Sequence, residues 1–455
     1  MVWVTGCILT AVMGQVAELS TERRGPLSLL SLDFYAKWFS ALLPAALIGG
    51  LCVLVASAFT GHGGDVIVGD ALGYFEYSRS LLIEHRLPVP FVKYPAGVSM
   101  VGILLYAPAV WITNALASAG AIAATDAVRR GMTLFEQIAF CIPSVLLAYV
   151  ALRANVGMLT RLGFAERVAK PAVLFFFVAT NIGFFVLKEP AMSESVTYSF
   201  VSLFYWGLVR WLWDPTATRI TRRLLVPAMT IGFFLGMAGA VRQQNILHAL
   251  AVPLVLWPQH ALPITRRLKK LILIAASSAL VFSIPWIVWY LTLGKFQLFM
   301  YCSWEHFNWL SPNPWAVLFE WKYHGLFVWH PLFLLAAIGL VPFFRSHRDL
   351  MAAWLVPLLI QAYLVAAWYH LSFGASFGGR GMFTIFPLLL CGFAAFVKRA
   401  TELDRERPLL AGALGLTVLN AALALLFSMQ RIDPYGAAPP LTKEQLNAGW
   451  TCPAR

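Results

Sequence analysis

The chain has 455 residues, of which 60% are apolar and only 12% charged, a balance that excludes an ordinary soluble domain and indicates a lipid-embedded protein. Its formal charge of +13 would suit nucleic-acid binding, but the Lys and Arg residues stand in polar breaks between apolar segments and form no single basic patch. We therefore expect a membrane protein with no nucleic-acid partner, whose basic residues mark one side of the membrane.

Apolar segments that approach the length of a membrane span, about 20 residues, recur along most of the chain. They lie at residues 41–60, 98–118, 133–153, 171–187, 195–213, 225–241, 243–258, 271–293, 326–344, 351–369, 381–397 and 409–427. They predict an all-α polytopic bundle of roughly eleven or twelve apolar segments. The membrane domain would cover 41–427, between a cytoplasmic or interfacial segment at 1–40 and an external tail at 428–455.

The breaks between these segments alternate in charge. Lys and Arg prefer cytoplasmic loops, and the basic breaks are 153–170, 210–223, 266–270, 345–348 and 398–407. The external breaks would then be 61–97, 188–194, 242–245, 294–325 and 370–380. The alternation fails before residue 153, because three crossings by that point would leave Arg153 outside. Either residues 98–118 are re-entrant or interfacial, which we prefer, or a boundary between 98 and 200 is misread.

The first external loop, 61–97, gathers acidic residues in a chain that has only 21 Asp and Glu in total. From Asp70 to Arg86, apolar residues interleave with polar ones, which predicts an amphipathic helix along the membrane surface. Asp70 precedes the apolar positions and is placed to cap that helix. Three prolines in PVPFVKYP would end it before the next apolar segment.

Two stretches of this region, GDALGYFEYSRSLL and KYPAGVSMVGILLYAPAV, resemble the first external loop and second apolar segment of GT-C type glycosyltransferases. These polytopic enzymes take a sugar from a polyprenyl-phosphate carrier. Further similar stretches follow in order: KEPAMSESVTYSFVSLFYW, AGAVRQQNILHAL, HGLFVWHPLFLLAAIGLV and SFGASFGGRGMFTIFPLLL. The resemblance spans most of residues 41 to 400 and is nearest to protein O-mannosyltransferase and aminoarabinose-transferase-like proteins.

The resemblance implies a GT-C helical bundle in a bacterial inner membrane, with an extracytoplasmic site and an inverting transfer to a lipid, glycan or protein hydroxyl. It also implies a catalytic acid early in the first external loop. Asp70 holds that position, and Asp65 is a second choice. Glu194 matches a second site acid at the outer end of a later span. The alternatives are a helix cap for Asp70, a plain turn for Asp65 and a span-end cap for Glu194.

A departing lipid phosphate needs cations, and Arg binds phosphate oxygens through two parallel hydrogen bonds. Arg242 and Arg380 stand in external breaks, and Lys188 and Lys93 are further candidates; the alternative for all four is anchoring at lipid headgroups. Aromatic faces suit sugar rings and prenyl chains, although they also gather at membrane interfaces. The remaining candidates for donor contacts are Tyr74, Tyr77 and His324.

The histidines of this sequence show no spacing that is typical of a metal site. A divalent cation such as Mg²⁺ or Mn²⁺ would need one or two carboxylates plus phosphate oxygens, so Asp70 is the candidate ligand if a cation takes part. The alternative function is a transporter or flippase of a lipid-linked sugar, because ionisable residues within the membrane also mark transport pathways.

Overall fold

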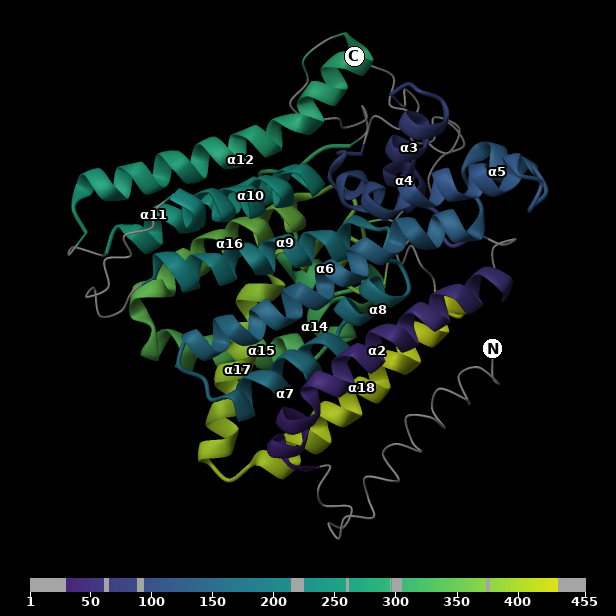
Figure 1. Ribbon diagram of the computed structural model, residues 1–455. Coiled ribbons are helices and arrows are strands. Elements are labelled where there is room, and N and C mark those ends of the chain that lie inside the picture. Colours follow the sequence, from purple (N-terminus) through teal and green to yellow (C-terminus); the bar gives the residue numbers. More distant parts are fainter. Residues whose placement is uncertain are drawn as a thin grey trace.

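The computed structural model describes residues 30–60, 65–87, 94–213, 225–258, 262–294, 296, 305–373 and 377–432. Within these ranges the regular elements are helices, and the only β contact is one isolated bridge between Phe307 and Trp368. The helices lie side by side in a bundle (Figure 1), which confirms the all-α prediction. The predictions for residues 1–29 and for the tail beyond residue 432 lie outside the described residues.

Seven helical stretches of the described chain are long and apolar enough to cross a membrane. They are α2 (Leu32–Thr60), α4 (Gly97–Ser118), α5 (Asp126–Arg130) with α6 (Leu134–Arg161), α12 (Ile264–Leu293), η5 (Arg348–Leu350) with α16 (Met351–Ala367), η6 (Arg380–Ile385) with α17 (Phe386–Glu402), and α18 (Glu406–Ser428). The bent pair α7 (Glu166–Val178) and α8 (Asn181–Leu187) would be an eighth. The chain is therefore a multi-pass helical membrane protein.

This number is lower than the eleven or twelve expected, because several apolar segments form shorter or irregular helices. The shorter helices are α9 (Ser193–Gly207) with η2 (Leu208–Leu212), α10 (Leu225–Val241), η3 (Gln243–Leu250) with α11 (Ala251–Leu256), α13 (Pro314–Phe319), η4 (Trp321–Tyr323), α14 (Leu326–Trp329) and α15 (Leu332–Ser346). The segment at 243–258, for example, begins as a 3₁₀-helix and ends in a six-residue α-helix. Length and hydropathy alone do not distinguish such segments from full spans.

Glycines allow two of these helices to pack closely. A Cβ added to Gly236 of α10 would lie 2.6 Å from the carbonyl oxygen of Ser278 in α12, so the two backbones are almost in contact. Gly232, one turn earlier, faces Ile274 and Ser277 of the same helix. Small residues at this spacing let membrane helices associate without large side chains between them. The pair forms one flank of the bundle (Figure 1).

The break between α7 and α8 bends the chain by 70°. A bend of this size interrupts the helical hydrogen bonds, and backbone groups inside a membrane need other partners. Asn420 of α18 supplies them, because its side-chain amide donates to the carbonyl oxygens of Val178 and Thr180 at 2.9 Å each. Asn420 thus stabilises a break that lies about 240 residues earlier in the chain.

The helix expected after residue 70 is present as α3 (Asp70–Ile83), but it packs into the protein and does not rest only on its surface. Its buried side chains include Tyr74, Phe75 and Tyr77. The Phe75 ring lies 4.9 Å from the ring of Tyr106 in α4 and 5.0 Å from that of Phe140 in α6. Because α3 also carries glycine and serine, its neighbours approach on more than one face, which an amphipathic pattern does not reveal.

Polar breaks from distant parts of the chain meet at each end of the bundle. At one end, a ring nitrogen of His347 lies 2.9 Å from the carbonyl oxygen of Leu162, and the indole N–H of Trp213 donates to Asp349 at 2.5 Å. Three of the basic breaks therefore meet there. Four of the breaks expected on the other side, 61–97, 188–194, 242–245 and 370–380, each contribute one charged residue to a cluster at the opposite end.

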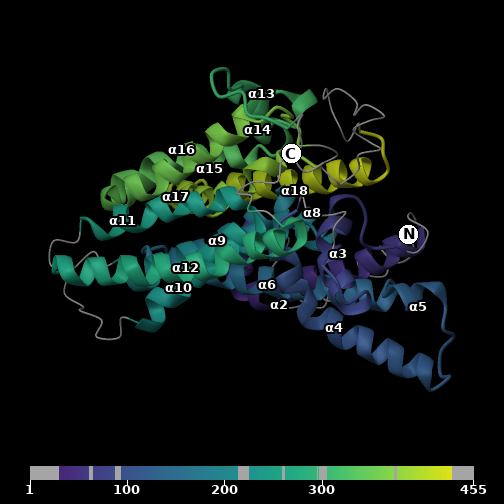
Figure 2. The same cartoon turned by 90° about the horizontal axis from the view of Figure 1, so that it is seen from above.

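The unmatched crossing before residue 153 concerns α4, whose two flanking segments contact the bundle at neighbouring places. Gly97 packs against the backbone of Val241, and Gln137 accepts hydrogen bonds from the backbone N–H groups of Val66 (2.8 Å) and Ile67 (3.0 Å). The chain thus leaves and re-enters the bundle at the same end, with α4 and α5 beside α3 at its edge (Figure 2). Since α4 is one continuous helix of 22 residues, it does not have the broken form of a re-entrant loop; by length and composition it could also cross a membrane.

Candidate functional site

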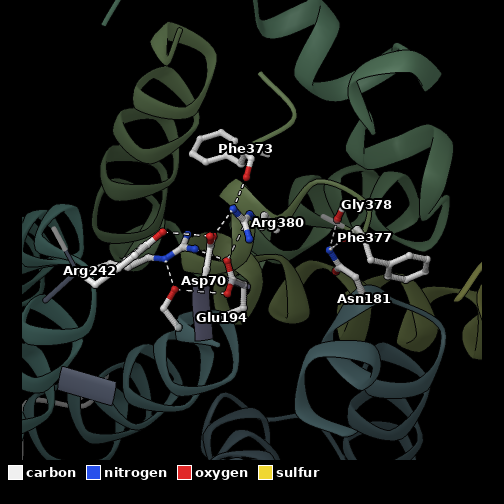
Figure 3. A network of polar contacts seen from close by, with 10 residues as sticks. Asp70, Asn181, Glu194, Arg242, Phe373, Phe377, Gly378 and Arg380 are labelled. Carbon is white, nitrogen blue, oxygen red and sulfur yellow. Dashed lines mark hydrogen bonds and ion pairs between the residues drawn. The ribbon is translucent and has the colours of Figure 1, made fainter. Parts of the chain in front are cut away.

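Four charged side chains of the described residues meet at one end of the bundle, and we call them the charge network: Asp70, Glu194, Arg242 and Arg380 (Figure 3). Asp70 begins α3, Glu194 lies in the first turn of α9, Arg242 precedes η3 and Arg380 begins η6. Their exposed side-chain fractions are 25%, 0%, 15% and 10%, respectively, so all four are largely removed from solvent. The sequence predicted each of them, and folding brings them together.

Glu194 connects the two arginines. Its Oε1 pairs with the guanidinium of Arg242 and lies 3.8 Å from Nε of Arg380. Arg242 also donates through Nε to the hydroxyl of Ser193 at 2.9 Å. Nη2 of Arg380 donates to Oδ2 of Asp70 at 2.9 Å. Two negative and two positive charges therefore balance, which is the condition under which buried ions are tolerated.

Asp70 does not act as the helix cap that was the alternative for it. The residue before α3 is Gly69, whose φ of 59° and ψ of −136° lie in a region that is essentially restricted to glycine. Asp70 is instead the first helical residue, and its Oδ1 accepts a hydrogen bond from the hydroxyl of Tyr94 at 3.0 Å. Tyr94 and Arg380 thus hold both oxygens of the carboxylate, and the dipole of α3 favours its negative charge.

The cap interpretation is also wrong for Glu194. The residue before α9 is Met192, and the Glu194 carboxylate points to Arg242 and Arg380, as Figure 3 shows. A carboxylate with no exposed side-chain area needs such partners, because an unpaired buried charge costs several kcal/mol, on the order of 3–5 when one partner is removed. Burial and pairing together identify Glu194 as the centre of the charge network.

Two tyrosines line the network on the α3 side. The rings of Tyr74 and Tyr94 lie 4.8 Å apart, and Tyr74 interacts with Ser193 and with the charge of Arg242. Burial raises the pKa of both phenols above the ordinary value, so they remain neutral hydrogen-bond donors. Tyr77 donates to the carbonyl oxygen of Tyr94 at 2.6 Å, so it orients Tyr94 and not the charged groups directly.

Sequence reasoning missed two residues of this region, Tyr94 and Glu189. Glu189 lies between α8 and α9, where burial raises the pKa of its carboxyl to about 7, with Arg380 acting against the shift and Glu194 adding to it. Its neighbour Lys188 is partly buried, and burial lowers the pKa of that amine. The KEPAMSES stretch already contained Glu189, and its position five residues before Glu194 was the available signal.

Two further candidates stand apart from the charge network. Asp65 accepts a hydrogen bond from the side-chain amide of Gln137 at 2.7 Å, which fits the turn alternative and anchors the loop to α6. His324 is buried, with its ring 4.5 Å from that of Trp329. Lys93 lies outside the described residues.

The charge network does not fit a resident metal ion. In the part of the chain that the structure describes, no three His, Cys, Asp or Glu side chains gather as a site made of protein ligands alone would require. A cation on Asp70 would also have to compete with the guanidinium of Arg380. The charge network is therefore a set of paired carboxylates and guanidinium groups.

No protein-family model matches the chain, and neither a curated protein nor a solved structure matches it at a significant level. The functional interpretation consequently depends on the geometry of the charge network and on the motifs of the sequence.

Proposed function

We propose that this protein is a membrane glycosyltransferase that moves a sugar from a polyprenyl-phosphate donor to an acceptor hydroxyl on the extracytoplasmic side of a bacterial inner membrane. The observation that supports this best is the charge network itself. Transfer from a lipid phosphate needs a base for the acceptor and cations for the phosphate, close to the membrane. Two carboxylates and two guanidinium groups from four separate segments supply that set at one end of the bundle.

Arg380 and Arg242 would hold the phosphate. Arg380 offers a specific place for it, because its Nε is buried and makes no hydrogen bond to any described residue. A buried donor without an acceptor is costly, about 1–3 kcal/mol, so an incoming phosphate oxygen would gain from accepting it. Guanidinium groups also bind phosphate through parallel hydrogen bonds, as they do carboxylates.

Asp70 would act as the base. It would take the proton of the acceptor hydroxyl while the acceptor oxygen forms a bond to the anomeric carbon and the bond from that carbon to the phosphate oxygen breaks. The electron pair leaves with the phosphate, whose charge Arg380 and Arg242 stabilise. A displacement of this kind inverts the anomeric carbon in one step. Tyr94 keeps the carboxylate in position through its hydrogen bond at 3.0 Å.

The side of the membrane follows from the charges at the two ends. Three of the five basic breaks meet around Leu162, Trp213 and His347, away from the charge network. Because Lys and Arg concentrate in cytoplasmic loops, the end with the charge network would face outward.

The test uses purified protein in lipid with a panel of polyprenyl-phosphate sugars, and compares wild type with Asp70→Asn. Wild type should bind and turn over one of these donors, and Asp70→Asn should bind it equally but transfer at least about a hundredfold more slowly. Asp65→Asn is the matched control, since it changes an acid of the same loop that lies outside the charge network. Donor translocation without turnover in all three proteins would refute the transferase and support the flippase alternative.

A further inference from the structure

A second group of buried polar side chains lies beside the charge network, around the turn that leads into Arg380. The side-chain amide of Asn181, the first residue of α8, donates to the carbonyl oxygens of Gly378 and Phe377 (Figure 3). Asn181 has no exposed surface, and its Oδ1 has no partner among the described residues. A fully buried amide of this kind is costly unless its hydrogen bonds serve the structure.

The turn that Asn181 holds has an unusual backbone. Gly378 and Gly379 both have positive φ, 42° and 55°. Two successive residues in this conformation are unfavourable for any residue with a side chain. The surroundings are also tight, because a Cβ at Gly379 would lie 3.1 Å from Leu326, and one at Gly378 would collide with the ring of His330. Arg380 follows directly, so the direction of its side chain depends on this turn.

The break directly before Asn181 is held by a contact from α18. Asn420 of α18 binds the carbonyl oxygens on both sides of the break that precedes α8, at 2.9 Å each. The break turns α8 toward the Gly378–Gly379 turn, where Phe184 also packs with its ring 4.5 Å from that of Phe377. A continuous set of contacts thus runs from Asn420 through Asn181 to Arg380.

From these contacts we infer that Asn181 is a positioning residue that fixes the Gly378–Gly379 turn and thereby aims the Arg380 guanidinium at Asp70 and Glu194. Arg380 bonds Asp70 across 310 positions of the sequence, and η6 begins at Arg380 itself, so no preceding helical turn sets the direction of its side chain. The consequence for phosphate binding rests on the proposed function, whereas the effect on the Asp70–Arg380 pair does not.

The test is a double-mutant cycle in the equilibrium unfolding of the full chain in detergent micelles. Asp70→Asn and Arg380→Gln measure the coupling between the two side chains, expected as about a tenfold effect on the unfolding constant. In an Asn181→Ala background this coupling should fall to about twofold. Asn155→Ala is the matched control, because Asn155 is equally buried and donates to Tyr198 (2.8 Å) and Ser202 (3.2 Å), away from the turn. The coupling should stay near tenfold in that control.

An undiminished coupling in Asn181→Ala, or an equal loss in Asn155→Ala, would overturn the inference. If Asn181→Ala does not fold, Gly379→Ala perturbs the same turn and should reduce the coupling in the same way. Donor binding provides a second readout, in which Asn181→Ala should weaken binding about tenfold and add nothing to Arg380→Gln. If wild type binds no polyprenyl-phosphate sugar, the proposed function fails, and the unfolding cycle still decides the role of Asn181.

Discussion

Replacing Glu194 by Gln should be among the most destabilising single changes to a charged residue of this protein. The carboxylate has no exposed side-chain area, and it pairs with Arg242 and lies 3.8 Å from Arg380. Breaking a buried ion pair by removing one partner costs about 3–5 kcal/mol. Because the Gln amide oxygen can still accept one hydrogen bond from Arg242, we expect the lower value, about 3 kcal/mol, or roughly a 150-fold increase in the unfolding constant.

The assay is equilibrium unfolding of the purified protein in micelles, followed by tryptophan fluorescence. The matched control is Glu166→Gln, which breaks the pair with Lys170 at 2.5 Å where the Glu166 side chain is 67% exposed. Exposed pairs contribute about 0–1 kcal/mol, so this variant should lose little stability. Removing both Glu194 and Arg242 should cost less than the sum of the two single changes. Equal losses in Glu194→Gln and Glu166→Gln would refute the assignment of Glu194 as the centre of the charge network.

Three further predictions concern the backbone, the topology and pH. Gly69→Ala should destabilise the protein by about 1–3 kcal/mol in the same unfolding assay, because the φ of 59° and ψ of −136° at Gly69 exclude a side chain; no loss would contradict this conformation. In a chain without its native cysteines, single cysteines can be placed at Ala121, Asp65 and Gly163 and labelled with a membrane-impermeant thiol reagent. The cysteine at Ala121 should react from the same side as the one at Asp65, and from the opposite side to the one at Gly163. Labelling of Ala121 together with Gly163 would instead show that α4 crosses the membrane. Glu189→Gln should gain stability relative to wild type as pH rises from 4.5 to about 7, since the carboxyl ionises near 4.5 when unfolded but near 7 when folded; a constant difference across this window would refute the raised pKa.

The site candidates show how far sequence reasoning reaches. Asp70 and Glu194 could be selected because their motifs resemble those of GT-C enzymes, and Arg242 and Arg380 because a charge beside an apolar segment is costly and conspicuous. The sequence could not show which of these charges pair, because Asp70 and Arg380 are 310 positions apart. Asp65 was the second choice within the same loop, and its hydrogen bond to Gln137 places it outside the charge network.

The sequence by itself determined that the chain is a helical membrane protein, and it placed the end of the segment at 225–241 at the residue where α10 ends, Val241, because hydropathy is a local property. Tertiary structure decided where an apolar segment breaks, as at Thr180, whose carbonyl oxygen is satisfied by Asn420 from a distant helix. It also decided that Asp70 and Arg380, 310 positions apart, form an ion pair. These outcomes depend on hydrogen bonds and close packing between segments remote in sequence, and such partners exist only once the chain has folded.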